Sequence, residues 1–491
     1  MNCGFKQLLG LAGLLAITGC KVGPNYKRPI LNTPANYRGG LAPDVAALTP
    51  ANATPLGAEK YTAVFTDPML QQLIAEALKN NYDVKIAADR VLEEQAAVGV
   101  TRAGQFPTLT GGASYNTLSL PGGLLSGLTN NNSSSSSSNS SSSNKRSNTY
   151  IGGFTASAAW NLDFWGYYRR MTEAQRAEFR ATQWAQQTTY STIIEDVATD
   201  YYQLRSLDAQ LAITRKTLDA RKQSLDLTNK LFQGGSDSLA DVRQAEELYY
   251  TAQAQIPDLL REIEQAENNL GLLLGRNPGS IARDITASQD LLANAPHPVD
   301  VPVGLPSDLL ERRPDIRRAE ELLVQANANI GVAKAQFFPT LSLSATGGTA
   351  SSQLKKVVDS DNIYVYAAGS LSQPIFDAGK IRNNYKEAKA RDQELLHTYQ
   401  QTIASALKDV SNALVGYSRS REYREQQEKQ TSAAADALRL ARMRYQAGST
   451  SYLEVLTTDA NLYSAQLTLA SVQQQEALAL VQLYNALGGG W

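Results

Sequence analysis

Two short stretches of the chain each place a serine three residues before an acid. Ser238 is followed by Asp241, and Ser451 is followed by Glu454. This S-x-x-D/E spacing is typical of the first turn of a helix, where a hydroxyl and a carboxylate cap free backbone N–H groups. The spacing therefore predicts a capping box or a simple N-terminal acid at each place. It also predicts that a helix begins beside each serine.

A cysteine near the N-terminus offers a different chemistry. Lys6 precedes an apolar run at residues 8–17, which is too short to span a bilayer, and the sequence Ile-Thr-Gly-Cys follows at 17–20. Small residues suit a protease and a thiol suits an acyl transferase, so the segment resembles the cleavage and lipidation signal of bacterial lipoproteins. We expect residues 1–19 to be a signal peptide and Cys20 to carry a covalent lipid. The alternatives are a plain secretory signal and a buried apolar N-terminus.

Composition argues against several classes of protein. The net charge is −1, so no basic field is available to hold nucleic acid. One cysteine remains after removal of the signal peptide, and neither histidine lies in a motif with Ser, Cys or Asp. We therefore expect a protein that is not an enzyme, with no metal and no cofactor beyond the lipid on Cys20. Lys21 follows the cysteine in place of Asp, which favours the outer membrane.

The chain contains the same unit twice. The sequence Phe-Pro-Thr-Leu at 106–109 recurs at 338–341, an offset of 232 in residue number, whereas the stretch that begins at Phe232 recurs at Tyr445, an offset of 213. The first copy is therefore longer by 19, and a tract of Asn and Ser at 130–144 accounts for 15 of these extra positions. The predicted parts are a signal peptide, a lipidated extended segment, repeat 1, a linker and repeat 2, at residues 1–19, 20–66, 67–278, 279–306 and 307–491.

Each repeat contains a predicted β-hairpin, at residues 107–163 and 339–374. Apolar and polar residues alternate with period two on both sides of each predicted turn. The Asn/Ser tract falls at the tip of the first hairpin. Such a tract has no apolar side chain to bury, and a hairpin tip in solvent tolerates a long insertion at small entropic cost. An interdomain linker is the alternative.

Long helices are predicted after each hairpin. Residues 167–232 contain neither Pro nor Gly, and residues 380–446 contain only Gly416. At ~1.5 Å per residue each helix would span about 100 Å, which exceeds the depth of a globular core. Such helices need lateral partners along their length, as in coiled coils. Predicted helices at 239–274 and 452–487 would supply these partners.

Four strands in one chain predict an oligomer. They cannot close a barrel, and they cannot lie open in lipid because the edge strands would leave backbone groups without hydrogen bonds. Two copies would supply eight strands and a filled interior, whereas three would supply twelve and leave a lumen. Three copies with two repeats each would also give a nearly six-fold tube of helices. We therefore expect a trimer.

Several stretches resemble the TolC/OprM-like outer membrane factors, which are outer-membrane efflux lipoproteins of tripartite export systems. They are the segment Cys20–Pro29, the sequence LPSDLLERRPDI at 305–316, the duplicated Phe-Pro-Thr-Leu and the C-terminal ALGGGW. The resemblance covers nearly all of the mature chain. It implies a mixed α/β membrane protein: a trimeric 12-stranded transmembrane β-barrel, with four strands per protomer, that continues into a long periplasmic α-helical barrel. It also implies passive export of small molecules delivered by an inner-membrane pump and a periplasmic adaptor (membrane fusion) protein.

The resemblance also implies roles at the periplasmic end. The two turns would contact the adaptor through Gly235, Ser238, Gly448 and Ser451. A gate or constriction would lie beside them at Asp241, Leu453, Glu454 and Thr457. Two positions depart from the family pattern, because Gly234 replaces a hydrophobic residue and Thr457 replaces a second acid. Turn chemistry alone is the alternative, with glycine ending one helix and serine capping the next.

Two other classes of function compete with an efflux duct. A trimeric, lipid-anchored surface scaffold or adhesin would need a long domain outside the cell, for which the Asn/Ser tract is the only candidate. A lipid-anchored periplasmic enzyme would need a nucleophile, metal or phosphate motif, and the sequence has none of these. The efflux duct is therefore the favoured hypothesis, with selection of cargo lying mostly in the pump.

Overall fold

The computed structural model describes residues 21–30, 34, 55–120, 147–236, 238–283 and 306–490. Cys20, the Asn/Ser tract and most of the linker lie outside these residues. The chain divides into two compact units. Unit 1 comprises Met1–Lys27, Gln95–Ala177 and Val324–Gln393, and unit 2 comprises Arg28–Glu94, Glu178–Leu323 and Glu394–Trp491. Each unit takes segments from both predicted repeats, so the units do not follow the internal duplication.

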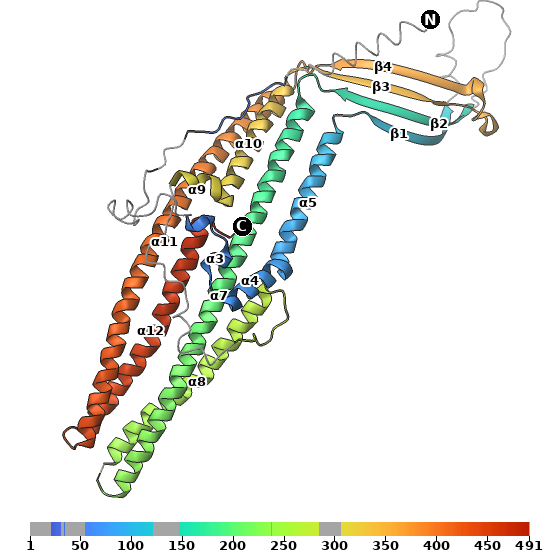
Figure 1. Cartoon of the computed structure of the whole chain (residues 1–491). Coiled ribbons are helices and arrows are strands. Elements are labelled where there is room, and N and C mark those ends of the chain that lie inside the picture. The colour runs from blue at the N-terminus through green and yellow to red at the C-terminus, as the bar shows by residue number, and fades with distance from the viewer. Residues whose placement is uncertain are drawn as a thin grey trace, which may run out of the picture. The chain divides into compact units, whose positions relative to one another are not determined.

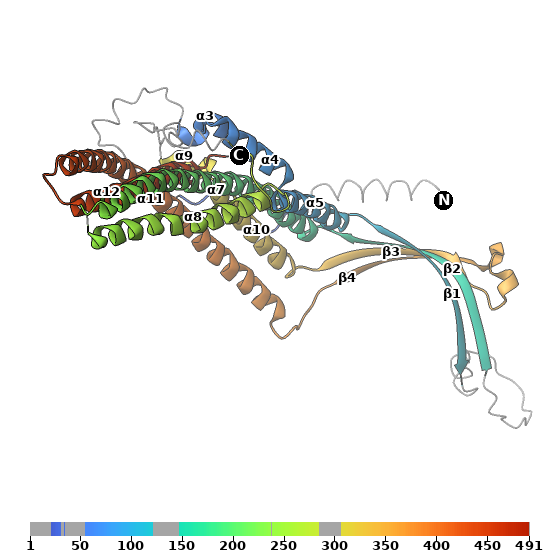
Figure 2. The same ribbon diagram turned by 90° about the horizontal axis from the view of Figure 1, so that it is seen from below.

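Unit 1 contains a single antiparallel sheet of four strands (Figures 1 and 2). The strands pair in sequence order as β1 (Thr108–Leu120), β2 (Ser147–Leu162), β3 (Thr340–Thr349) and β4 (Ile363–Ser372). The two hairpins join through β2 and β3, where Ala158 lies opposite Ala345. Among the described residues, β1 and β4 each pair with one neighbour only, so the sheet has two open edges.

Large apolar side chains on the strands are exposed in the single chain. Leu109 is 79% exposed and Val365 is 80% exposed. The others on the sheet are Tyr115, Ile151, Phe154, Leu343, Ile363, Tyr364, Tyr366 and Leu371. Contact of so much apolar surface with water is unfavourable, and patches of this kind indicate contact with lipid or protein.

Shorter helices precede the strands. Two minor elements, η1 (Leu56–Ala58) and α3 (Tyr61–Val64), lead into α4 (Pro68–Asn80) and α5 (Tyr82–Ala103), which come before β1. In the second half of the chain, α9 (Pro306–Arg312) and α10 (Pro314–Ala335) come before β3. Two short 3₁₀ turns, η3 (Leu354–Lys356) and η4 (Ser360–Asn362), join β3 to β4. None of the helices in the described ranges is both long and apolar enough to cross a membrane.

Two helical hairpins follow the strands (Figure 1). In the first, α7 (Tyr167–Gln233) has 67 residues and α8 (Leu239–Leu273) has 35. In the second, α11 (Lys380–Gln446) also has 67 and α12 (Tyr452–Ala486) also has 35. Each helix boundary in the second hairpin lies the same number of residues after its equivalent in the first. This number is the offset between Tyr167 and Lys380. The offset of 213 found in the sequence therefore holds along both hairpins, with no insertion in either.

The four helices of these hairpins end in the same way. A glycine with positive φ follows each of them, at Gly235, Gly275, Gly448 and Gly488. The next N–H then donates back to the last turn, as from Ser236 to the Leu231 carbonyl at 2.8 Å. Glycine adopts this left-handed conformation without steric cost, so it ends the helix sharply.

In unit 1, the segment that follows Cys20 is held by a buried arginine. Arg170 of α7 is 1% exposed and donates to the Val22 carbonyl at 3.1 Å, to the Gly23 carbonyl at 3.2 Å and to Asn25 Oδ1 at 3.0 Å. Gly23 packs so closely on Gly331 that a Cβ there would lie 2.5 Å from the Gly331 Cα. The N-terminal arm therefore has a defined docking place at the start of α7.

Candidate functional site at the ends of the helical hairpins

The turn between α7 and α8 holds two of the predicted adaptor-contact residues. Gly235 has a φ of +77°, and Ser238 is the N-cap of α8. Ser238 Oγ accepts from the backbone N–H of Asp241 at 3.2 Å, and Asp241 Oδ2 accepts from the backbone N–H and the hydroxyl of Ser238 at 3.2 and 2.6 Å. The capping box that the sequence predicts is confirmed here. No described cation forms an ion pair with Asp241.

The turn between α11 and α12 uses the equivalent acid differently. Gly448 has a φ of +70°, but the N-cap Ser451 makes no side-chain capping bond. Glu454 instead lies 2.7 Å from Arg444 Nη1 and accepts a hydrogen bond from the Thr450 hydroxyl. Of the two arrangements that the sequence predicts, the structure shows the second here: Glu454 is a simple acid in the first turn of α12 and forms no capping box with Ser451. The longer Glu side chain reaches Arg444 at the end of α11, and these two partners outcompete Ser451.

The other predicted residues also lie in the first turns of α12 or in the turns between helices. Leu453 is 57% exposed, and the Thr457 hydroxyl donates to the Leu453 carbonyl at 2.9 Å. All four predicted adaptor-contact residues are exposed: Gly235, Ser238, Gly448 and Ser451. The two connecting turns and the first two helical turns of α8 and α12 thus contain every residue assigned to the gate and to adaptor contact, and those roles remain predictions.

A buried ion pair, which no local sequence motif indicates, links the two hairpins. Arg221 of α7 is 5% exposed, and its Nε lies 2.8 Å from Asp459 Oδ2 of α12. Arg221 Nη1 also donates to the Leu248 carbonyl of α8 at 2.8 Å, and its guanidinium lies 4.9 Å from the ring centroid of Tyr463. Arg442 of α11 lies 3.4 Å from the other oxygen of Asp459. All four helices therefore meet at this ion pair.

Hydroxyl contacts and an apolar cluster lie beside the ion pair. Ser224 Oγ and Tyr452 Oη lie 2.7 Å apart, and Thr214 Oγ1 lies 3.0 Å from Tyr463 Oη. The buried members of the cluster are Ala245, Leu438, Ala441, Tyr452, Val455 and Leu456. These contacts join the first hairpin to the second within one chain.

Comparison of the two repeats gives one signal of the ion pair. Arg221 and Asp459 are far apart in the chain, so no local motif contains both. The positions that correspond to them in the other repeat are Ala434 and Glu246. A charge that appears in one copy of a duplicated helix, and is replaced by alanine in the other, could have marked Arg221 as a functional position.

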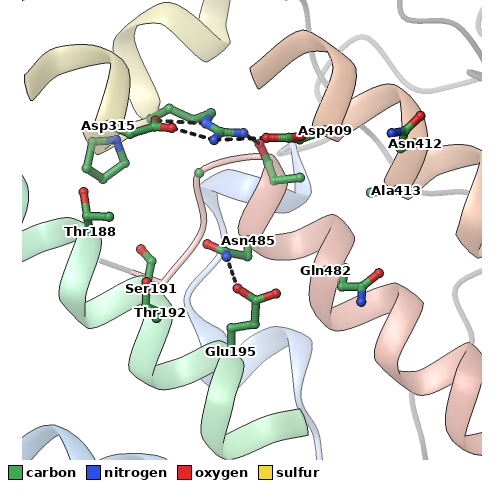
Figure 3. Close-up of a pocket in the computed structure, with 14 residues that line it drawn as sticks. Thr188, Ser191, Thr192, Glu195, Asp315, Asp409, Asn412, Ala413, Gln482 and Asn485 are labelled. Carbon is green, nitrogen blue, oxygen red and sulfur yellow. Dashed lines mark hydrogen bonds and ion pairs between the residues drawn. The ribbon is translucent and has the colours of Figure 1, made fainter. Parts of the chain in front are cut away.

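A polar cavity of about 360 Å³ lies elsewhere in unit 2 (Figure 3). Arg313 makes two hydrogen bonds to Asp315, at 2.9 and 2.6 Å, and lies 3.7 Å from Asp409 of α11. On the opposite side, Glu195 of α7 accepts a hydrogen bond from Asn485 of α12. Arg313 and Asp315 belong to the sequence LPSDLLERRPDI, so this part of the motif forms a cavity wall.

Acids on α7 near the cavity are shifted by burial. Burial raises the pKa of Glu195 and of Asp196, and the charge of Asp83 raises the pKa of Asp196 further. Burial together with the charge of Asp196 raises the pKa of Asp200 to about 6. The equivalent positions on α11 are Lys408, Asp409 and Ala413, so this acidic set belongs to the first repeat only. Within the described ranges, no group of three or more His, Cys, Asp or Glu is arranged to hold a metal ion.

Comparison with known proteins agrees with this architecture. Residues 73–276 and 305–489 match the family described as outer membrane efflux protein. The solvent efflux pump outer membrane protein SrpC of Pseudomonas putida is 36% identical over 494 residues, which covers 99% of this chain and 98% of SrpC. The cation efflux system protein CusC of Escherichia coli K12 is 32% identical over 484 residues, which covers 99% of each chain.

Solved structures give the same result for the fold. A crystal structure of CusC is 30% identical and superposes with a TM-score of 0.80, covering 96% of this chain and all of that one. The open state of the MtrE outer membrane channel of Neisseria gonorrhoeae is 28% identical with a TM-score of 0.81, covering 96% and 98%. The chain therefore belongs to the outer membrane efflux protein family. It is an outer-membrane efflux channel protein. This result confirms the resemblance inferred from the sequence and favours the efflux channel over the surface scaffold.

Proposed function

We propose that three copies of this chain form the exit duct of a tripartite efflux system and conduct small molecules passively across the outer membrane. The observation that carries the proposal is the sheet of unit 1, with open edges at β1 and β4 and exposed apolar side chains on its strands. Pairing of β1 in one copy with β4 in the next would satisfy both edges. Three copies would then enclose a lumen with twelve strands, which is a trimeric β-barrel.

The two helical hairpins would continue this duct into the periplasm. Three copies supply six hairpins of equal length, enough for a closed helical barrel. Their ends would meet the periplasmic adaptor through Gly235, Ser238, Gly448 and Ser451, and an inner-membrane pump would deliver the cargo. Exposure of these four residues supports the assignment.

The constriction would lie one helical turn away from the adaptor contacts. Asp241 and Glu454 would bring six carboxylates to the narrow end of a trimer, together with Leu453 and Thr457. Like charges in a confined lumen repel one another, so they would favour passage of cations. Arg444 offsets the charge of Glu454, and Asp241 would therefore contribute the larger share of the field.

The lipid on Cys20 would enter the outer membrane beside the sheet. The N–H of Val22 donates to the Trp165 carbonyl at 3.1 Å, and Trp165 Nε1 donates to the Pro339 carbonyl at 2.9 Å, directly before β3. The docked arm therefore lies beside the start of a strand. This position supports a lipid anchor that shares its membrane with the barrel.

The names of the relatives support small molecules as cargo but do not point to one kind of molecule. Their names divide between solvent or toluene efflux at 36% identity and cation efflux at 32 to 33%. Because relatives of similar identity carry such different names, we propose that the pump selects the cargo and that the duct is permissive.

Two measurements on the purified full-length protein test this proposal. Light scattering in detergent should give the mass of three chains, and insertion into planar bilayers should give stable single-channel conductance. A single-chain mass would contradict the trimer. A trimer that inserts into lipid and never conducts would contradict the duct.

A further inference from the structure

The polar cavity of unit 2 contains a buried hydroxyl that has no hydrogen-bond partner. Ser191 of α7 lines the cavity and is 7% exposed, and its Oγ makes no hydrogen bond to any described residue. A serine hydroxyl can donate one hydrogen bond and accept two, and its burial without a partner is unfavourable. A ligand in the cavity that bonds to this hydroxyl would remove that cost.

A carboxylate on the same helix has no counter-charge. Glu195 lies one helical turn after Ser191, and it accepts a hydrogen bond from the amide of Asn485 (Figure 3). No described cation forms an ion pair with Glu195, and burial raises its pKa. A carboxylate that is partly removed from water is stabilised by a positive partner. Ser191 and Glu195 therefore offer a hydrogen-bonding group and an uncompensated negative charge on one face of α7.

The opposite wall of the cavity is electrically balanced. Arg313 makes two hydrogen bonds to Asp315 and lies 3.7 Å from Asp409. Lys408 Nζ lies 3.2 Å from the other oxygen of Asp409. The two cations of this wall thus offset its two acids, and the guanidinium is already engaged by carboxylates. The charge left over is that of Glu195, so the cavity suits a cation better than an anion.

The rest of the polar lining consists of neutral hydroxyls and amides. These residues are Thr188, Ser191, Thr192, Asn412, Gln482 and Asn485. Hydroxyls and amides both donate and accept hydrogen bonds, so they match a ligand that carries several hydroxyl groups. A volume of about 360 Å³ is that of a small-molecule site and far exceeds the volume of a single ion.

The duplication shows that the helices do not require this polar lining. The residues of the other repeat that correspond to Ser191 and Glu195 are Ala404 and Lys408, and Asn485 corresponds to Leu272. The same backbone therefore forms with a methyl group, a positive charge and an apolar side chain at these positions. The free hydroxyl and the unpaired carboxylate belong to the first repeat alone, which favours a role in binding over a role in folding.

We propose that this cavity binds a small organic cation that carries a primary ammonium group and several hydroxyls, which is the chemistry of an amino sugar. The ammonium group would pair with Glu195, and the hydroxyls would bond to Ser191, Asn412 and Gln482. A charge-assisted hydrogen bond is stronger than a neutral one, so Glu195 would contribute most of the affinity. The cavity lies within unit 2 of one chain, so the site goes beyond the proposed duct and does not depend on the trimer.

Three sugars of similar size test the proposal. Glucosamine carries an ammonium group where glucose carries a hydroxyl and N-acetylglucosamine carries a neutral amide. In saturation-transfer NMR titrations of the purified full-length protein at neutral pH, glucosamine should bind about tenfold more tightly than either neutral sugar. Equal binding of the three sugars, or no binding of glucosamine, would overturn the proposal.

Substitutions locate the site. Glu195→Gln keeps the size of the side chain and its acceptor for Asn485 but removes the charge, so it should weaken glucosamine binding about tenfold and abolish the preference over glucose. Ser191→Ala should weaken binding roughly fivefold. The matched control, Asp219→Asn, removes an exposed acid of α7 that does not line the cavity, and it should bind as the wild type does.

The outcomes separate this site from the proposed duct. Circular dichroism first checks that each variant keeps the wild-type helix content, and Ser191→Ala together with the three sugars still decides the matter if Glu195→Gln does not fold. Wild-type affinity in Glu195→Gln, or an equal loss in Asp219→Asn, would contradict the site. Conductance of the same preparation is measured in parallel. Glucosamine binding without conductance contradicts the duct alone, and conductance without binding contradicts the site alone.

Discussion

The first helical hairpin, α7 and α8, and the second, α11 and α12, share a backbone plan but differ in their side chains. Both have helices of 67 and 35 residues, and both have left-handed glycines after their helices. At the first turn, Asp241 closes a capping box, whereas at the second Glu454 pairs with Arg444. The duplicated backbone thus specifies the shape of the hairpins, and a few substituted side chains give the two turns different charges.

The same comparison separates two kinds of ion pair. The second hairpin meets the first through Arg221, Asp459 and the Tyr452 hydroxyl, all within one chain. The equivalent positions of the first hairpin differ, because Leu239 lacks the hydroxyl of Tyr452 and Glu246 pairs with the exposed Arg243 of its own helix at 2.6 Å. A duplicated backbone can therefore carry a buried ion pair at one position and an exposed one at the equivalent position.

The largest effect is expected from the ion pair. Arg221→Ala removes one partner of a buried pair and leaves Asp459, which is 12% exposed, with only Arg442 nearby. We expect a loss of about 3 kcal/mol in the free energy of unfolding. Glu246→Ala, at the position equivalent to Asp459, should change it by about 0.5 kcal/mol or less, because its partner Arg243 is exposed. Urea melts followed by circular dichroism would measure both, and equal losses would contradict the larger contribution of the buried ion pair.

A smaller effect is expected from the acids that only the first repeat carries. Asp200 has a pKa raised to about 6 from its ordinary value of 3.8, so its ionisation disfavours the folded state. The contribution of Asp200 to stability is complete below about pH 4 and is lost as pH rises through 6. Asp200→Asn should therefore raise the free energy of unfolding at neutral pH, by roughly 1 kcal/mol once solvent screening is considered, and should not change it in acid. Urea melts at a series of pH values would measure the difference.

The control for that measurement lies on α11. The position on α11 equivalent to Asp200 is Ala413, and Asp409 lies one helical turn before it in the chain. Lys408 and Arg313 lie close to Asp409, so Asp409→Asn changes an acid whose charge is already offset. It should give no stabilisation at neutral pH. A pH profile for Asp200→Asn that runs parallel to the wild-type profile would show that Asp200 is not the group responsible.

The turns should differ in ion selectivity more than in stability. Asp241→Asn should lower cation selectivity in bilayers more than Glu454→Gln, because Arg444 already offsets Glu454. Each substitution should cost about 1 kcal/mol of stability or less. Arg444→Gln should raise cation selectivity by releasing Glu454, and reversal potentials across a salt gradient would measure all three. Variants that melt earlier yet conduct identically would leave these acids as helix caps only.

The smallest effect is expected from the tract that only the first repeat contains. Deletion of residues 130–144 brings the first β-hairpin close to the length of the second. The trimer, its conductance and export should change little, because shortening a solvent loop alters the closure entropy by about 0.5 kcal/mol or so. A deletion variant that no longer enters the outer membrane would show that the tract is structural.

Local features of the fold could be predicted from the sequence. The absence of Gly and Pro predicts a helix at 167–232, and the structure has one at Tyr167–Gln233. Period-two alternation predicts the strands, and the capping box at Ser238 needs only residues three positions apart. Each of these features depends on residues that are neighbours in the chain.

Features that depend on distant residues could not be predicted. The partners Arg221 and Asp459 come together only after both hairpins have formed. The same limit explains why the sequence leaves the arrangement at Ser451 open, because competition from Arg444 depends on how α11 packs beside α12. It also explains why the boundaries of the compact units do not follow the repeats. β2 and β3 lie in different halves of the chain, and their pairing joins both halves in one sheet.

The equal lengths of the helices in the two hairpins also limit where the chain can accept an insertion. One added residue in α7 would turn all later side chains by about 100° and move the first turn out of line with the second. The offset between the two halves is larger from β1 (Thr108) to β3 (Thr340) than from α7 (Tyr167) to α11 (Lys380), and it stays constant from there to the ends of α8 and α12. The change in length that separates the two halves along this stretch therefore lies between the start of each β-hairpin and the start of the long helix that follows it. An insertion between the strands leaves the helices in register, whereas an insertion in one helical hairpin keeps the two turns level only if the other hairpin gains the same length.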